Sequence, residues 1–368
     1  MKSARNHKIK TLAGCFLLTL SLIFSLVGCQ FASFTSPDGN DGTGADEGEN
    51  SLTPPESVDG SGTEEPPKEE TPPKPLFYNR YTGLTCDEAV SSCRPVSVCI
   101  GNFDGKRQEG LSFADILIET PVPGEETRLW AITNDLQKIA AIKNIAAAEP
   151  YMFTNAKAFD AVSVFNGAKE IPSSLPNLNY ASGTLGSYFS STDGLVSSTG
   201  TQLKNALEAN SVSLSETQHS LPFAFTELGT TFKPQGNHIS NIYFAFSEKN
   251  TVSFTYNQES GSYFRSQSGT VHKDDYNGAQ LAFENVILLF SNVSYYHSPN
   301  GTTFSIDSTS GGSGFCYTGG GVENISWSVL EDGTLLFRGT NGEIITVNRG
   351  KTYIGVLRVT DSTTLIAR

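Results

Sequence analysis

The chain has 368 residues and a formal net charge of −13 at pH 7, with 38 acidic against 25 basic residues. No segment carries a basic stripe, so this balance excludes a partner bound through its phosphate backbone, such as nucleic acid. Anionic lipid headgroups would not attract the chain either.

The first 28 residues are typical of an export signal. Four basic residues and no acid lie among the first ten, and an uncharged run follows to residue 28. The run ends in Leu26-Val27-Gly28-Cys29, where small residues precede a cysteine as a lipoprotein-processing peptidase requires. We therefore expect cleavage before Cys29 and lipidation of Cys29. Two or three acyl chains would anchor the protein to its membrane, whereas a single chain binds only marginally. An uncleaved membrane helix is the alternative, since about 18 apolar residues can just cross a bilayer.

Residues 29–76 are expected to form a disordered tether that begins at the lipidated Cys29. Eight prolines and eleven acids, against two lysines, lie between residues 30 and 76. Few apolar residues and a net charge of −9 leave too little burial to offset the entropy of ordering. A flexible coil of this length spans roughly 40 Å. The rest of the chain, residues 77–368, is acidic too and would stand off the outer face of the membrane.

Four cysteines remain in the exported part. The spacing of Cys86, Cys93 and Cys99 does not match the paired cysteines of structural zinc sites, so we predict no metal and no cofactor. A disulfide between Cys86 and Cys93 is one candidate pairing. Cys99 lies in an alternating apolar segment, which predicts a buried free thiol.

Residues 77–235 are predicted to form a mixed α/β domain. Apolar helical spacing over 135–148 indicates one helix, and a second is expected over 200–210 with Thr201 as its cap. Short strands are expected in four segments, namely 95–100, 115–119, 128–133 and 160–165.

Residues 236–368 show strand patterns without helical periodicity. Asn-Gly and Asp-Gly pairs separate the segments and favour tight hairpins. We expect an antiparallel β-rich domain, a sandwich or open barrel, and therefore an α+β fold class for the chain. The predicted strands are 242–246, 251–256, 263–265, 281–290, 324–330, 334–338, 343–347 and 352–357.

Glycine-rich runs at 311–314 and 319–321 flank Phe315-Cys316-Tyr317-Thr318. A phosphate-binding loop would lead into a helix with a Lys-Ser or Lys-Thr pair, and neither is present. A mobile connection between strands is the favoured interpretation.

His272-Lys273-Asp274 is the most suggestive histidine motif, because an imidazole and a carboxylate two residues apart could share a metal or pass a proton. The following Asn277-Gly278 favours a solvated hairpin end instead. No Gly-x-Ser-x-Gly elbow is present, so no catalytic residue is assigned.

Several motifs occur in a fixed order over about residues 78–358. The clearest are Tyr81-Thr82-Gly83-Leu84, Arg94-Pro95-Val96-Ser97-Val98, Gly110-Leu111-Ser112-Phe113-Ala114-Asp115-Ile116, Tyr263-Phe264-Arg265, His272-x-Asp274, Asn285-Val286-Ile287 and Gly350-Lys351-Thr352. In these motifs the chain resembles the YerB-like lipoproteins, a family with a pair of domains of unknown function on a lipid anchor, mostly in Gram-positive bacteria. The resemblance implies location and fold and leaves activity open.

The chain departs from the family where an arginine-containing run is expected. Ala140 to Ala146 retains only Lys143 as a base, so planar bidentate recognition of an anion is lost there.

Two function classes remain open, with a transport receptor as a third. The first is a non-catalytic envelope module that binds a wall polymer or envelope protein, and the second is a wall hydrolase using Glu119 and another carboxylate. Missing nucleophile and metal motifs favour binding. The candidate binding residues are Asn102, Arg107, Glu119, Arg128 and Lys143, in a groove between strands and helix, with His272, Asp274 and Asn285.

Overall fold

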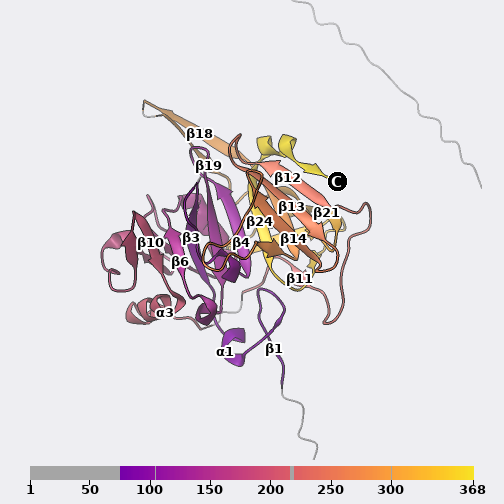
Figure 1. Cartoon of the computed structure of the whole chain (residues 1–368). Coiled ribbons are helices and arrows are strands. Elements are labelled where there is room, and N and C mark those ends of the chain that lie inside the picture. The colour runs from indigo at the N-terminus through magenta and orange to yellow at the C-terminus, as the bar shows by residue number, and fades with distance from the viewer. Residues whose placement is uncertain (1–74, 104, 216–218, 300) are drawn as a thin grey trace, which may run out of the picture. The chain divides into compact units, whose positions relative to one another are not determined.

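The computed structural model describes residues 75–103, 105–215, 219–299 and 301–368, so the predicted signal, Cys29 and the tether up to residue 74 lie outside the described residues. A mixed sheet of 13 strands lies at its centre (Figure 1). The strands are β3 (Val96–Asn102), β4 (Ile116–Pro121), β5 (Thr127–Thr133), β6 (Ile142–Ile145), β7 (Val162–Phe165), β8 (Asn177–Asn179), β9 (Ser190–Thr192), β10 (Leu195–Ser198), β17 (Asn285–Ser291), β20 (Gly312–Thr318), β21 (Gly321–Val329), β22 (Leu335–Gly339) and β24 (Thr352–Arg358).

The large sheet joins strands from the two ends of the chain. Its order is β22-β21-β20-β17-β24-β4-β5-β3-β6-β10-β9, and β7 and β8 continue from β3. At its centre β24 runs parallel to both β17 and β4, which places the yellow C-terminal strand beside purple N-terminal ones (Figure 1). The expected wholly antiparallel C-terminal sandwich or barrel is therefore wrong, because its central strands pair in parallel with each other and with β4.

A second sheet of six strands packs on one face of the first. Phe244, Phe254 and Tyr263 of this sheet share a core with Val286 and Leu288 of β17. Its strands are β12 (Asn241–Ala245), β13 (Thr251–Asn257), β14 (Ser262–Gln267), β15 (Thr270–Val271), β16 (Ala282–Phe283) and β25 (Ile366–Ala367).

Three two-stranded sheets complete the described strands. The hairpin of β18 and β19 extends away from the rest (Figure 1). The pairs are β1 (Phe77–Tyr78) with β2 (Thr85–Cys86), β11 (Ala224–Phe225) with β23 (Thr346–Val347), and β18 (Val293–Ser298) with β19 (Gly301–Ile306).

The helices in the described residues are short, and none is long and apolar enough to cross a membrane. On the face opposite the second sheet, Phe153 packs edge-on against Trp130. The α-helices are α1 (Glu88–Ser91), α2 (Phe153–Lys157) and α3 (Gly200–Ala209). The 3-10 turns are η1 (Leu111–Phe113), η2 (Leu136–Lys138), η3 (Pro150–Met152), η4 (Tyr180–Ser182) and η5 (Val359–Thr364).

The α+β fold class and the mixed α/β N-terminal domain expected from the sequence are wrong, because the structure is mostly β. The predicted helix over 135–148 is instead the turn η2 followed by β6. Asn144 has a left-handed φ of 71° and lies at a register shift against β10. This bulge adds one residue to the strand, so Ile142 and Ile145 both face the core although they are three apart, a spacing that mimics a helix.

The helix predicted over 200–210 is confirmed as α3. Its cap is Thr199 and not Thr201, since the Thr199 hydroxyl accepts a hydrogen bond from the backbone N–H of Gln202 at 3.2 Å. Leu203, Ala206 and Leu207 form its buried face.

The glycine-rich segment is not a loose connection. Gly312 and Gly314 lie within β20, where a Cβ atom would strike the carbonyls of Phe290 and Leu288 on β17. Glycine is therefore needed there for close strand packing, and the interpretation as a mobile connection is wrong for residues 312–318.

Candidate functional site

Glu119 on β4 lies at the centre of a buried polar cluster between the two sheets. Its Oε1 accepts hydrogen bonds from Asn102 Nδ2 at 2.9 Å and Thr127 Oγ1 at 2.7 Å. Its Oε2 accepts from Arg265 Nη2 and Tyr353 Oη, both at 2.7 Å. We call this group, with Gln108, Gln267 and His272, the polar junction.

Hydrogen bonds from the second guanidinium nitrogen of Arg265 connect the members of the polar junction in a ring. Its Nη1 donates to Gln267 Oε1 at 2.9 Å and to His272 Nδ1. His272 Nε2 contacts Gln108 Oε1 at 2.7 Å, and Gln108 Nε2 donates to Asn102 Oδ1 at 3.0 Å. With Nδ1 accepting, His272 is the neutral tautomer that donates through Nε2.

The polar junction fits a structural role better than a catalytic one. Both charged partners, Glu119 and Arg265, are fully buried, so each needs the other to offset its loss of hydration. Burial and the neighbouring Glu119 raise the pKa of Tyr353 well above its usual range, so its hydroxyl remains a donor. The two carboxylate oxygens of Glu119 accept four hydrogen bonds from neighbouring side chains, so Glu119 is not free to act on a substrate. The hydrolase hypothesis relied on this carboxylate and therefore loses it.

Asp274 connects residues 110–112, in the loop before β4, to the second sheet through hydrogen bonds. Its carboxylate accepts from Gly110 N, from Ser112 N at 2.8 Å and from Ser112 Oγ at 2.6 Å, as well as from Tyr276 N at 2.9 Å. Asp274 is fully buried, and His272 is 8% exposed. The expected solvated hairpin end is therefore wrong: the motif is a tertiary contact.

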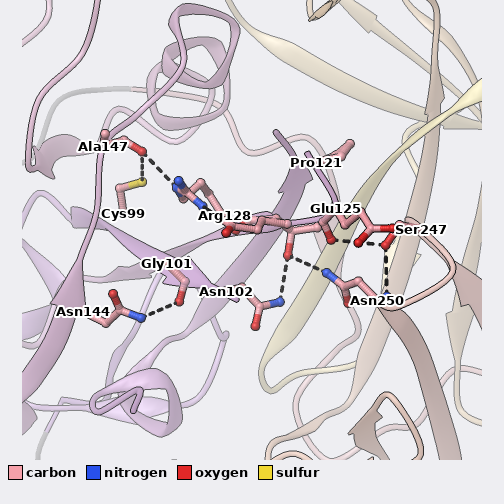
Figure 2. Close-up of polar contacts among 12 residues, drawn as sticks. Cys99, Gly101, Asn102, Pro121, Glu125, Arg128, Asn144, Ala147, Ser247 and Asn250 are labelled. Carbon is pink, nitrogen blue, oxygen red and sulfur yellow. Dashed lines mark hydrogen bonds and ion pairs between the residues drawn. The ribbon is translucent and has the colours of Figure 1, made fainter. Parts of the chain in front are cut away.

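Arg128 lies on the opposite face of the large sheet from Glu119. Its Nε donates to the carbonyl of Ala147 at 3.1 Å, and its Nη1 contacts Glu126 at 3.1 Å. In Figure 2 Arg128 reaches toward Ala147 while Asn102 and Asn250 approach the strand from its other side. Since neighbouring residues of a strand face opposite ways and Glu119 lies opposite Leu129, Arg128 and Glu119 cannot form an ion pair with each other.

The remaining candidate residues also lie apart. Arg107 is exposed and pairs with Glu109 at 2.6 Å. Lys143 lies half-buried in β6, whereas Asn285 is enclosed with Thr318, Asn348 and Thr352. Because the helix over 135–148 is absent and these side chains scatter, the proposed groove between strands and helix does not form.

Cys86, Cys93, Cys99 and Cys316 are all free thiols, so the candidate disulfide between Cys86 and Cys93 is not formed in this structure. Burial raises the pKa of Cys99 to about 12. Within the described ranges, no group of three or more His, Cys, Asp or Glu side chains could hold a metal ion.

An open pocket of about 590 Å³ lies where β13 ends and the turn between β20 and β21 begins. We call it the glycine-turn pocket. Its wall includes Phe232, Lys233, His238, Tyr256, Gln258, Glu259 and Gly319.

Gly319 lines this pocket, and the turn Gly319-Gly320-Gly321 that contains it requires glycine. Gly320 has a φ of 75°, and a Cβ there would lie 2.7 Å from atoms of both His238 and Tyr256. Its N–H donates to Tyr263 Oη at 3.1 Å, and its carbonyl accepts from Ile239 N at 2.9 Å. The second glycine run therefore serves close packing against residues 232–239.

Several polar groups in the glycine-turn pocket are free to meet a ligand. Within the part of the chain that the structure describes, the Tyr256 hydroxyl and the side chains of Gln258 and Glu259 have no hydrogen-bond partner. Burial raises the pKa of Tyr256, which keeps its hydroxyl protonated.

Sequence reasoning missed Arg265, Tyr353, Tyr256 and the role of His238. A signal for Arg265 exists: alternation in β14 puts it on the same side as buried Tyr263, where an unpaired charge would not be tolerated. No comparable sequence signal points to Glu119, the partner of Arg265 on β4.

Comparisons with known proteins agree on one family. Residues 81–190 match the N-terminal domain, and residues 242–354 the C-terminal domain, of a protein of unknown function termed DUF3048. The chain is 27% identical over 284 residues to "Putative lipoprotein YerB" of Bacillus subtilis, covering 73% of this chain and 80% of that protein. The crystal structure of the YerB protein from Bacillus subtilis aligns with a TM-score of 0.67 at 24% identity, over 79% of this chain and 99% of the other. The structural likeness shows the fold.

Proposed function

This chain belongs to the YerB-like family of paired DUF3048 domains, and we propose that it is a lipid-anchored protein on the outer face of the cell membrane whose folded part binds an envelope component without altering it chemically. The motif Leu26-Val27-Gly28-Cys29 supports the anchor, and the name of the Bacillus subtilis relative agrees with it. The expected partners are the membrane, through Cys29, and a wall polymer or envelope protein.

The contrast between two sites carries the binding proposal. In the polar junction, Glu119 is enclosed and fully hydrogen-bonded, as a structural ion pair requires. In the glycine-turn pocket, polar groups without internal partners surround an open space beside aromatic rings. Ligand sites combine such apolar walls with a few polar groups.

Two experiments test the two parts of this proposal. A Cys29→Ser variant should leave the membrane fraction and fail to incorporate labelled palmitate, because the acyl anchor is lost; unchanged fractionation would contradict anchoring.

Purified protein incubated with labelled wall fragments should retain them at unchanged size. Release of shorter fragments would favour the hydrolase instead.

A further inference from the structure

We propose that the glycine-turn pocket binds an uncharged, hydroxyl-rich saccharide unit, with one face of the sugar ring against Tyr256 and its hydroxyls hydrogen-bonded to Gln258 and Glu259. This inference rests on the binding function proposed above and names its class of ligand.

The Tyr256 ring in the pocket wall is fixed by its packing against other aromatic side chains. The Tyr256 ring packs against buried Tyr263 with centroids 4.8 Å apart, and against His238 at 5.7 Å in an edge-on arrangement. Tyr263 is in turn fixed by the N–H of Gly320. Sugar C–H groups carry partial positive charge and pack on the electron-rich face of such a ring.

The charges around the pocket favour an uncharged ligand. Lys233 and Glu259 contribute opposite formal charges, and Lys233 Nζ lies 3.4 Å from His238 Nδ1. Residues 77–368 carry a net charge of −8, which would repel a polyanion. A ligand bearing many neutral donors and acceptors can use the amide of Gln258 and the carboxylate of Glu259 without that penalty.

The size and rigidity of the pocket fit the same ligand class. Its volume of about 590 Å³ falls among those of small-molecule sites. The Ile239 N–H donates to the Gly320 carbonyl at 2.9 Å, and the Asn348 side chain hydrogen-bonds both backbone groups of Phe232, which holds residues 232–239 and the glycine turn in place. Little ordering entropy is therefore lost when a ligand binds, which matters for weak saccharide contacts.

The test uses the full-length protein in a detergent without a sugar headgroup, with maltotriose and triacetylchitotriose as probes and titration calorimetry as the readout. At least one trisaccharide should bind, and Tyr256→Ala should weaken that binding about tenfold. Tyr256→Phe keeps the ring and should bind nearly as well. Tyr243→Ala is the matched control, because Tyr243 is exposed on the neighbouring strand outside the pocket.

Gln258→Ala gives a second test that cannot be confused with misfolding, since Gln258 is an exposed turn residue without an internal hydrogen bond. It too should weaken binding. Saccharide binding that neither variant changes would overturn the site. If wall fragments are retained but neither trisaccharide binds, the proposed ligand class is wrong and the proposed binding function stands. If neither wall fragments nor trisaccharides bind, both proposals are wrong.

Discussion

Glu119 and Arg265 are 146 positions apart in the chain, yet their side chains form an ion pair of 2.7 Å with no solvent exposure on either partner. Glu119 comes from the large sheet and Arg265 from the second sheet. The pair can therefore exist only when the two sheets are packed together.

Glu119→Gln should destabilise the folded part of the protein by about 3–5 kcal/mol, because it leaves a buried guanidinium without its counter-charge. Urea unfolding followed by circular dichroism measures this loss. Glu125→Gln is the matched control: it breaks the exposed pair with Lys249 and should leave the free energy of unfolding unchanged. Equal stability of the two variants would contradict a structural role for the polar junction.

Asp274→Ala should cost about 3 kcal/mol, because three donors of the loop before β4 lose their buried acceptor. Native-state hydrogen exchange should show faster exchange at the N–H groups of Gly110 and Ser112. Lys273→Ala, at the exposed position beside it, should change stability by less than about 0.5 kcal/mol. Unaltered protection in the Asp274 variant would show that this contact is dispensable.

Thiol labelling should separate the four cysteines into two classes. Cys86 and Cys93 are partly exposed and should react with a thiol reagent at mildly alkaline pH, whereas buried Cys99 and Cys316 should react only after unfolding. Mass spectrometry of the labelled chain measures this. If neither Cys86 nor Cys93 reacts until a reductant is added, the disulfide considered from the sequence forms after all.

Stability should fall as the pH rises above about 9. Burial raises the pKa of several tyrosines and of Cys99 and Cys316 in the folded state, whereas the unfolded chain ionises them near their ordinary values. The unfolded state then binds fewer protons, so the free energy of unfolding decreases with pH. Lys351 acts in the opposite direction, because burial lowers its pKa, but it is one group against several. The tyrosines concerned are Tyr151, Tyr263, Tyr317 and Tyr353.

A spectrophotometric titration checks this pH dependence. The tyrosinate signal of the buried tyrosines should rise together with unfolding. A smooth ionisation of all tyrosines before the fold is lost would refute the prediction.

Gly320→Ala should destabilise the protein by about 3 kcal/mol and abolish saccharide binding, because the added methyl group meets both His238 and Tyr256 in a left-handed backbone conformation. Gly278→Ala is the control: its φ of 73° is similar but no atom lies within 4 Å of the added carbon. It should lose only about 1 kcal/mol of stability from backbone strain and bind normally. Equal effects in urea unfolding would show that the collision is relieved at no cost.

Local patterns were sufficient for much of the β structure. The apolar segments around Val98 and Ile132 predict β3 and β5, and the apolar spacing of Leu203, Ala206 and Leu207 predicts α3. Strands β3 and β5 are buried on both faces and α3 on one, and the apolar residues that this burial requires are visible along the chain. Family membership was also readable from ordered motifs over about residues 78–358.

Only the tertiary structure decided the rest. The bulge at Asn144 turns a helical spacing into a strand, because its register depends on β10, some 50 residues further along. The partner of Glu119, the burial of Asp274 and the wall of the glycine-turn pocket all depend on which strands meet across the two sheets. Periodicity determines which side of a strand is buried, and the pairing between distant segments determines what each buried polar group touches.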